Sequence, residues 1–321
     1  MKYDLSIIIP AIPGRFDRLK AQISRLTLSK MRAPSIKMEV IIVDGGSTDS
    51  TRELCLKIAP ILNIKYVYLP INKFINAAYP RNVGIRCAEG KILAQLDIDH
   101  WPGENIVQGM TQPFMELGLS KIINRGYVID SSESEYCKIH GIQVAEQINE
   151  PLLQDSSMGK RILDIYQHTR VPAPGINKTL WIWAVLREPI IEMNAYDENY
   201  LKAYCREDDD FRERLLSQGC PFYDGQNQNF CAIHLWHPAN WRAGADVETN
   251  KAYFMSTLPA YTKIKRNEGK SWGRMIPNSY AVINGKTYEP CDFEKWISDN
   301  IKDVIPYTDN PIRATLKVED N

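Results

Sequence analysis

Residues 40–61 read VIIVDGGSTDSTRELCLKIAPI, and this stretch contains the signals of a strand, a turn and a helix in that order. The β-branched run Val40–Val43 is typical of a strand that is buried on both faces of a sheet. The turn residues Asp44, Gly45 and Gly46 follow it. Ser50 and Glu53 then have capping-box spacing at the start of a helix whose apolar residues recur at 54, 58 and 61. The stretch therefore predicts one strand–helix unit.

The same alternation continues on both sides of this unit. Before it, residues 5–9 form an apolar run closed by Pro10, and a helical period follows at Leu19, Ile23 and Leu26. After it come a strand over 64–69, a helix from about Ala77 with Gly90 as its C′ residue, and an apolar run over 92–96. Continuous apolar strands separated by helices predict an α/β fold, with a mostly parallel sheet covered on both faces.

Two carboxylates follow the last of these runs, at Asp97 and Asp99. In a strand, residues two apart point to the same face, so the pair would face one ligand together. Close carboxylates need a cation or protons, and oxygen ligands suit Mg²⁺ or Mn²⁺. Taken alone, the pair is more simply explained as a solvated acidic turn before Pro102. Ligands bind beyond the carboxyl ends of parallel strands, where the loops after Pro10 and Asp44 also lie, and this favours a site.

The composition is that of an ordinary globular protein. Of 321 residues, 39 are Lys or Arg and 39 are Asp or Glu, so nothing in the overall charge indicates a nucleic-acid partner. No apolar run approaches the length of about 18 residues that a membrane-spanning helix needs. The seven scattered cysteines include no CxxC pair, which favours a reduced, cytoplasmic location.

Four motifs in the first hundred residues together resemble the family 2-type glycosyltransferases of the GT-A fold. These motifs are the strand that ends at Pro10, the segment VDGGSTDST at 43–51, the pair Arg81-Asn82 before a helix that ends in glycine, and the D-x-D motif at Asp97 and Asp99. Their order and ordinary spacing carry the resemblance, since each motif alone is weak. The resemblance implies a GT-A sheet, which is Rossmann-like, and a nucleotide-sugar donor.

The resemblance extends to about residue 237 through a second acidic motif. Residues 207–215, EDDDFRERL, are similar to the acidic run of β-1,4-galactosyltransferases and bacterial chondroitin-type polymerases. A histidine often completes the metal site downstream in those groups, and His234 and His237 occupy that position here. Two segments depart from the pattern. Residues 193–196 lack the usual glycines, and Tyr204-Cys205-Arg206 replaces a tryptophan–glycine pair, so acceptor identity does not carry over.

For the donor side, the resemblance implies contacts from four residues, which are Pro10, Asp44, Arg81 and Asp97. A divalent cation, Mn²⁺ or Mg²⁺, would be held by Asp99 with Asp97 and His234, and His237 is the second choice for the histidine. Each assignment has a structural alternative. Asp44 would simply form a turn, Arg81 would be an exposed helix residue, and the histidines would pack beside Trp236.

For the acceptor side, the resemblance assigns Asp208 as the general base that takes a proton from the acceptor hydroxyl. Glu207 and Asp209 would hold acceptor hydroxyls, and Trp183 offers an aromatic face to a sugar. The alternative for the acidic run is a helix start, where acidic residues complement the helix dipole. The alternative for Trp183 is ordinary core packing.

These features predict a metal-dependent, inverting glycosyltransferase that moves a sugar from a UDP-sugar to a hydroxyl of a glycan or glycoconjugate. Its GT-A domain would span residues 1–240, with a donor half to about 100 and an acceptor half to 240. Residues 241–321 would form a C-terminal extension, either as packing or as a surface for an anionic or membrane-linked acceptor. The rival functions are a sugar-nucleotide nucleotidyltransferase, for which the loop after Pro10 fits poorly, and a non-catalytic carbohydrate-binding protein.

Overall fold

The computed structural model describes residues 1–47, 50–71, 76–130, 182–202, 205–223, 229–235, 246–258, 265–268 and 272–304. Its main feature is a nine-stranded sheet with the order β12-β11-β3-β2-β1-β4-β8-β6-β9. A second sheet of three strands has the order β5-β10-β7. The fold is therefore mixed α/β, and its two sheets are described in turn.

Four parallel strands form the centre of the large sheet. They are β1 (Tyr3–Ala11), β2 (Met38–Asp44), β3 (Ile64–Tyr68) and β4 (Gly90–Gln95). Strand β1 lies between β2 and β4, and β2 pairs with β3 on its other side. Nearly every side chain of these strands is buried, as expected for strands with helices on both faces. The predicted α/β fold with a mostly parallel central sheet is confirmed.

Antiparallel strands extend this centre at both edges. On the β4 side lie β8 (Trp183–Leu186) and β6 (Ile123–Arg125), followed by β9 (Phe222–Tyr223), which runs parallel to β6. On the β3 side lie β11 (Tyr280–Ile283) and β12 (Lys286–Tyr288). Strand β11 pairs with β3 although more than 200 residues separate them in sequence. The predicted C-terminal extension thus contributes strands to the same sheet.

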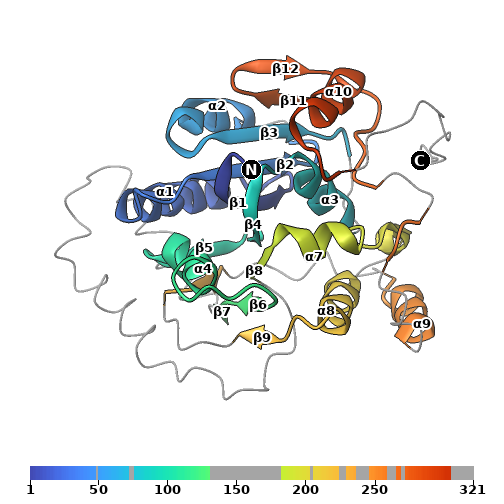
Figure 1. The fold of residues 1–321 in the computed structure, drawn as a ribbon. Helices are drawn as coiled ribbons and strands as arrows, with labels where there is room; N and C mark the ends of the chain where they lie inside the picture. The colour runs from blue at the N-terminus through green and yellow to red at the C-terminus, as the bar shows by residue number, and fades with distance from the viewer. Residues whose placement is uncertain are drawn as a thin grey trace.

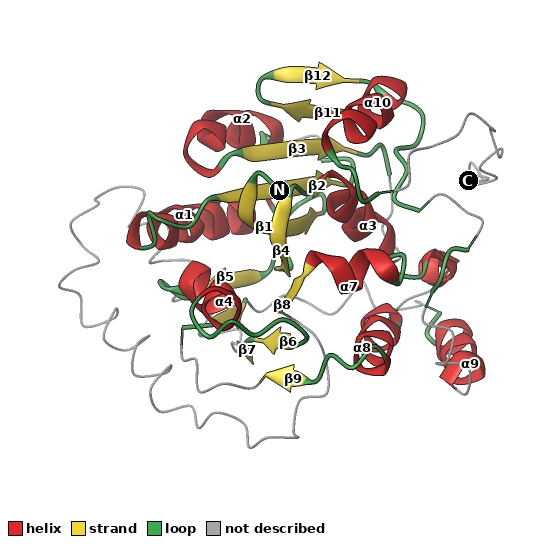
Figure 2. Cartoon of the chain, viewed as in Figure 1, coloured by secondary structure: helices red, strands yellow, loops and turns green. Residues whose placement is uncertain are grey.

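Helices cover both faces of the sheet, as Figure 1 and Figure 2 show. One buried cluster joins the sheet to α1 (Phe16–Arg32), α2 (Thr51–Leu62) and α4 (Ile106–Met115). The other joins the opposite face to α3 (Ala78–Cys87), α7 (Arg187–Glu192), α8 (Glu207–Ser217) and α10 (Pro290–Asn300). The 3-10 helix η2 (Glu198–Lys202) packs against α3 and against helix α9 (Glu248–Thr257).

Two local predictions at helix ends are wrong. Helix α3 ends at Cys87 with the extended residue Ala88 as its cap, and Gly90 is the first residue of β4. A Cβ atom at Gly90 would lie 2.6 Å from the backbone nitrogen of Ser6, so glycine is needed there for close packing against β1. At the start of α2, Ser50 is the N-cap residue, but its side chain makes no capping hydrogen bond.

The three-stranded sheet lies beyond the end of β4. It contains β5 (His100–Pro102), β7 (Tyr127–Asp130) and β10 (Cys231–His234). Strand β10 pairs antiparallel with β5, and this pairing puts His234 directly opposite His100. The Leu235 N–H also donates to the Asp99 carbonyl oxygen at 2.8 Å. This small sheet therefore brings the predicted histidine next to the D-x-D segment.

Candidate active site

The site is centred on the turn that follows β4. Strand β4 ends at Gln95, and the turn is closed by the His100 N–H, which donates to the Asp97 carbonyl oxygen at 2.9 Å. Because the backbone turns here, Asp97 and Asp99 do not share one face as residues of a continuous strand would. Asp97 faces α3 and Asp99 faces α1. The expectation that strand geometry points both carboxylates at one ligand is corrected by this turn.

Arg81 of α3 connects the D-x-D motif to the second acidic motif. Its guanidinium lies 3.0 Å from Asp97 Oδ1, 2.7 Å from Asp208 Oδ1 and 3.3 Å from Glu207 Oε1. The side chain is only 4% exposed, whereas those of Asp97 and Asp208 are 37% and 27% exposed. Arg81 is thus neither the exposed helix residue of the structural alternative nor a side chain open to a diphosphate. It holds one carboxylate of the D-x-D motif and one of the second acidic motif together.

These contacts set opposite protonation tendencies in the two carboxylates. Burial raises the pKa of Asp208 well above its ordinary value, and the neighbouring carboxylates of Glu207 and Asp97 add to this effect while Arg81 opposes it. Burial also disfavours ionisation of Asp97, yet Arg81 and the nearby His100 and His234 hold its pKa below the usual value. Asp97 is therefore the permanent anion of the pair, and Asp208 is the group that readily binds a proton.

The acidic run opens α8, and the helix directs its four carboxylates to different partners. Glu207 accepts hydrogen bonds from Asn76 at 2.8 Å and from Arg81 at 3.3 Å, so both of its oxygens are engaged. Asp209 forms ion pairs with Arg206 at 2.8 Å and Arg212 at 2.7 Å. The predicted contacts of Glu207 and Asp209 with acceptor hydroxyls would require these pairs to open. Asp208 is the member of the run that combines solvent exposure with contact to Arg81.

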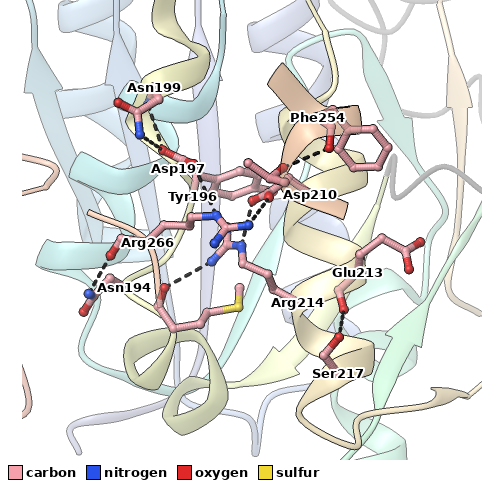
Figure 3. A network of polar contacts seen from close by, with 12 residues as sticks. Asn194, Tyr196, Asp197, Asn199, Asp210, Glu213, Arg214, Ser217, Phe254 and Arg266 are labelled. Carbon is pink, nitrogen blue, oxygen red and sulfur yellow. Dashed lines mark hydrogen bonds and ion pairs between the residues drawn. The ribbon is translucent and has the colours of Figure 1, made fainter. Parts of the chain in front are cut away.

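Asp210, the fourth acid of the run, is structural (Figure 3). Its carboxylate pairs with Arg214 at 2.6 Å, and both side chains are fully buried. Arg266 reaches the same carboxylate at 3.5 Å and Asp197 at 3.4 Å. Arg214 also donates to the Met193 carbonyl oxygen at 3.1 Å. This network fixes the start of α8 against the preceding segment, and it places Arg266, a residue of the predicted C-terminal extension, in the interior.

Trp183 supports this site from the protein interior. The prediction that its ring contacts the acceptor sugar is corrected. The ring is fully buried, so it has no surface on which a sugar could stack. Its Nε1–H donates to the Tyr196 hydroxyl at 3.2 Å, and that hydroxyl donates to Gln95 Oε1 at 2.6 Å. The Gln95 amide nitrogen lies 3.4 Å from Asp97 Oδ1. A chain of hydrogen bonds therefore runs from the core to the D-x-D carboxylate.

The two segments that depart from the family pattern have a conformation that glycine normally adopts. Asn194 and Ala195 have φ values of 58° and 54°, and Cys205 and Arg206 have values of 65° and 74°. Such left-handed backbone costs about 1–2 kcal/mol per residue when a Cβ atom is present. Neither segment contains glycine, but both have the positive φ values that glycine usually adopts. The second lies directly before Glu207, so the acidic motif is presented from a strained turn.

Helix α1 holds the other side of the D-x-D turn through buried polar residues. Arg15, just before the helix, contacts Asp99 Oδ1 at 2.8 Å, and Arg18 binds the same oxygen. Gln22 donates to the carbonyl oxygens of Asp97 at 2.8 Å and His100 at 2.9 Å.

Farther along α1, Arg25 donates to the Pro102 carbonyl oxygen at 3.3 Å, and Ser29 accepts from the Val107 N–H at 3.0 Å. With Arg15, Arg18 and Gln22, these residues recur every three or four positions, which places them on one helix face. One side of α1 thus binds the chain from 97 to 107.

His100 and His234 lie side by side next to the carboxylates of Asp97 and Asp99. Their ring centroids are 5.7 Å apart, and His100 Nδ1 accepts a hydrogen bond from the Asp97 N–H at 3.0 Å. Burial lowers the pKa of His100 to about 4, so this imidazole is neutral. The acceptor role of Nδ1 places its proton on Nε2. His100 therefore positions the D-x-D turn, a role that the sequence pattern did not predict.

The side chains gathered here are of the types that bind a divalent cation. Two carboxylates and two imidazoles are ligands that Mn²⁺ accepts, and carboxylates also suit Mg²⁺. In the described part of the chain, however, no three His, Cys, Asp or Glu side chains are arranged to hold a metal ion. Asp99 faces two arginines instead of its predicted co-ligands. Cation binding by Asp97, Asp99 and His234 thus remains a prediction, and His237 lies outside the described residues.

Two further predicted donor contacts are placed in the interior. Pro10 is buried within β1, in register with Val43. Asp44 has no exposed surface, since its carboxylate accepts from the Ser47 N–H at 3.0 Å and from the Tyr66 hydroxyl at 2.6 Å. Asp44 therefore shapes the loop after β2, as its structural alternative proposed, and a direct contact with a nucleobase is not available to it in this conformation.

The fold agrees with that of a solved glycosyltransferase. TarS residues 1–349 from S. aureus, in complex with UDP-GlcNAc, superimpose with a TM-score of 0.50 over 94% of this chain and 72% of that one, at 14% identity. Likeness at this identity establishes the fold alone. The nine-stranded sheet and the D-x-D turn after β4 thus define a protein of the GT-A fold.

The sequence matches the family described as glycosyl transferase family 2 over residues 6–171, which is more than half of the chain. The chain belongs to glycosyl transferase family 2. The match includes β1 through the D-x-D turn and ends before the second acidic motif. The resemblance of residues 207–215 to other groups therefore stays a prediction.

Curated relatives match over shorter stretches. GlyG, a glycosyltransferase of Streptococcus pneumoniae serotype 4, is 31% identical over 99 residues, which are 31% of this chain and 33% of that protein. Validoxylamine A glucosyltransferase of Streptomyces hygroscopicus subsp. limoneus is 34% identical over 108 residues, 33% of this chain and 22% of that protein. The matched region thus spans a third or less of the length of these relatives.

Proposed function

We propose that this chain is a glycosyltransferase that transfers a sugar from a UDP-sugar to a hydroxyl group of a glycan or glycoconjugate, with inversion at the anomeric carbon. The observation that carries the proposal is the pair of contacts made by Arg81. Because its guanidinium binds both Asp97 and Asp208, the D-x-D turn and a partly exposed candidate base meet at one point. Family membership and the UDP-GlcNAc bound to the structurally similar TarS support the choice of donor.

In the proposed reaction Asp208 acts on the acceptor. Its carboxylate takes the hydroxyl proton while the hydroxyl oxygen bonds to the anomeric carbon, and the bond from that carbon to the diphosphate oxygen breaks. The raised pKa of Asp208 makes it a stronger base once it is ionised. Attack on the face opposite the leaving diphosphate inverts the anomeric centre.

Asp97, Asp99 and His234 would hold the divalent cation, and a bound Mn²⁺ or Mg²⁺ would neutralise the leaving diphosphate. Gln95 and His100 orient the turn that carries the two carboxylates, through the Asp97 side chain and the Asp97 N–H respectively. Tyr196 supports Gln95 from the interior. These residues preset the site before substrate arrives.

The test uses the purified full chain. Calorimetry with UDP and other nucleoside diphosphates, with and without Mn²⁺, measures donor recognition, and release of UDP from a panel of UDP-sugars measures turnover. Asp208→Asn should keep UDP binding and lose UDP release, while Glu213→Gln on the same helix should keep both. Glu213 is a suitable control because it pairs with Arg212, away from Arg81. No binding of any nucleoside diphosphate would exclude the proposed function.

The chemical steps have separate readouts. Asp99→Ala should abolish metal-dependent UDP binding. Turnover should rise with pH through the pKa of Asp208, since the base acts only when it is ionised. Retained configuration in the product, observed by NMR, would contradict the inverting mechanism. The cytoplasmic location stays a prediction. Among the described residues, no helix has the length and apolar character of a membrane span.

A further inference from the structure

The carboxylate of Asp99 is already bound by two cations of the protein itself. Arg15 and Arg18 both contact Asp99 Oδ1, and the three side chains are 10–15% exposed. Arg18 also donates to the Leu235 carbonyl oxygen at 3.2 Å, which ties the group to the end of β10. The predicted metal ligand is thus held on the α1 side of the turn. Any cation that Asp99 ligates must compete with two guanidinium groups.

The two carboxylates of the D-x-D motif have different charged neighbours. On the α1 side, the guanidinium groups of Arg15 and Arg18 both contact the one carboxylate of Asp99. Around Arg81 the balance is reversed, because one guanidinium faces three carboxylates. The α1 side thus offers guanidinium groups that an anion can bind, and the α3 side offers carboxylates that a cation can bind.

Arg81 is poorly placed to bind a phosphate. Its side chain is almost completely buried, and a phosphate there would approach the carboxylates of Asp97, Glu207 and Asp208. Arg15 and Arg18 lie instead at the start of α1, where the helix dipole adds partial positive charge. Guanidinium groups match the oxygens of a diphosphate in shape as well as charge. The first turn of α1 thus has the chemistry of a diphosphate subsite.

We propose that Arg15 and Arg18 bind the donor's diphosphate, and that Asp99 is exchanged from these arginines to the divalent cation as the diphosphate arrives. This inference rests on the proposed function and adds the residues that receive the leaving group. No covalent bond changes in the exchange. The diphosphate oxygens replace the Asp99 carboxylate on the guanidinium groups, and the released carboxylate turns towards the cation near Asp97.

The exchange makes cation and diphosphate depend on each other. The cation alone binds weakly, because Asp99 must leave two arginines without a replacement anion. The diphosphate alone binds weakly, because it must displace Asp99 from both arginines and no cation takes up the displaced carboxylate. When both ligands bind, the diphosphate replaces Asp99 on the arginines and the cation binds the released carboxylate. Each ligand therefore makes binding of the other more favourable, and such coupling is reciprocal. Removing an arginine should therefore affect the two ligands in opposite directions.

The experiment measures both ligands on the full chain. Electron paramagnetic resonance follows binding of Mn²⁺ alone, and calorimetry follows binding of UDP at saturating Mn²⁺. In Arg18→Ala and, separately, in the more exposed Arg15→Ala, Mn²⁺ alone should bind about tenfold more tightly and UDP about tenfold more weakly. Arg25→Ala is the matched control, because Arg25 lies on the same face of α1 but contacts Pro102 and Glu104. It should change neither affinity.

The opposite signs separate this inference from simple damage to the fold, which would weaken both ligands. If Arg15→Ala and Arg18→Ala leave the Mn²⁺ affinity unchanged or lower it, Asp99 is not in exchange. If they leave the UDP affinity unchanged, the diphosphate does not use these arginines. Either result overturns the inference while wild-type binding of UDP still supports the proposed function. Absence of UDP binding in the wild type would overturn both.

Discussion

Replacement of Arg81 by methionine tests whether the site is held together by this one guanidinium. Methionine fills a similar volume without charge, so Asp97, Glu207 and Asp208 would keep their positions but lose the cation that they share. A charge pair at 4 Å contributes about 4 kcal/mol at an effective dielectric constant near 20. Much of this is offset by solvation and by proton uptake. Removing one partner of a buried pair typically costs about 3–5 kcal/mol, and we expect Arg81→Met to lose this much stability at pH 7.

The loss of stability caused by Arg81→Met should change with pH in a defined direction. In the folded wild type the pKa of Asp208 is raised, so above the unfolded value, near 3.9, the folded state binds more protons than the unfolded state. Stability therefore falls as pH rises from about 4 towards the folded pKa of Asp208. Arg81→Met removes the cation that lowers the pKa of Asp97 and opposes the rise in the pKa of Asp208, so it enlarges this fall. The variant should be closer to the wild type at pH 5 than at pH 7.

Urea denaturation at pH 5, 6 and 7 measures this effect. Arg86→Met is the matched control, because Arg86 is a buried arginine of the same helix that pairs with a single carboxylate, Glu294, at 2.7 and 2.8 Å. Its destabilisation should change less with pH, since one carboxylate and not three is left behind. An equal loss for Arg81→Met at pH 5 and pH 7 would refute the electrostatic argument and leave only packing.

Four further substitutions have defined outcomes in thermal or urea unfolding. Gly90→Ala should cost more than about 2 kcal/mol, because its Cβ atom would collide with the Ser6 backbone; a neutral result would show that β1 and β4 can separate there. Gly285→Ala, at φ 76° with open space around it, should cost about 1–2 kcal/mol from backbone strain alone. Cys205→Gly should stabilise by up to about 1 kcal/mol by relieving φ 65°, unless lost side-chain contacts outweigh it. Tyr196→Phe should cost about 1–3 kcal/mol, because the Gln95 and Trp183 side chains lose their hydroxyl partner; an unchanged midpoint would contradict the supporting role of that hydroxyl.

The central strands and the helices between them could be predicted from the sequence because burial on both faces leaves an unbroken apolar run. The strand over 40–43 and the helix after Ser50 are examples. The edge strands carried no such signal. Strand β11 is only four residues long, and β9 is two, so their place in the sheet depends on contacts that are distant in sequence.

The candidate site was predictable in part. The residue types at Arg81, Asp97 and Asp208 indicated chemistry, and the structure brings those three side chains together. Asp97 pairs with Arg81, whereas Asp99 pairs with Arg15 and Arg18, because the chain turns after β4. The spacing of the sequence alone does not reveal this turn. The buried polar face of α1 was also missed. Its period was visible at Arg15, Arg18 and Gln22, but such residues are ordinarily solvent-exposed, and only the D-x-D turn packed against them explains their burial.

The pairing of β11 with β3 has a consequence for the order in which the chain is made. Tyr280 pairs with Tyr68, so the partner of the β3 edge is synthesised about 210 residues later. At about 5–20 residues per second, that edge would wait for roughly 10–40 seconds on the ribosome. During this interval its N–H and C=O groups are open to pairing with another chain. Strand β11 therefore covers the β3 edge of a sheet whose centre was complete long before, and helix α10 packs beside β11 and is anchored to α3 through Glu294 and Arg86.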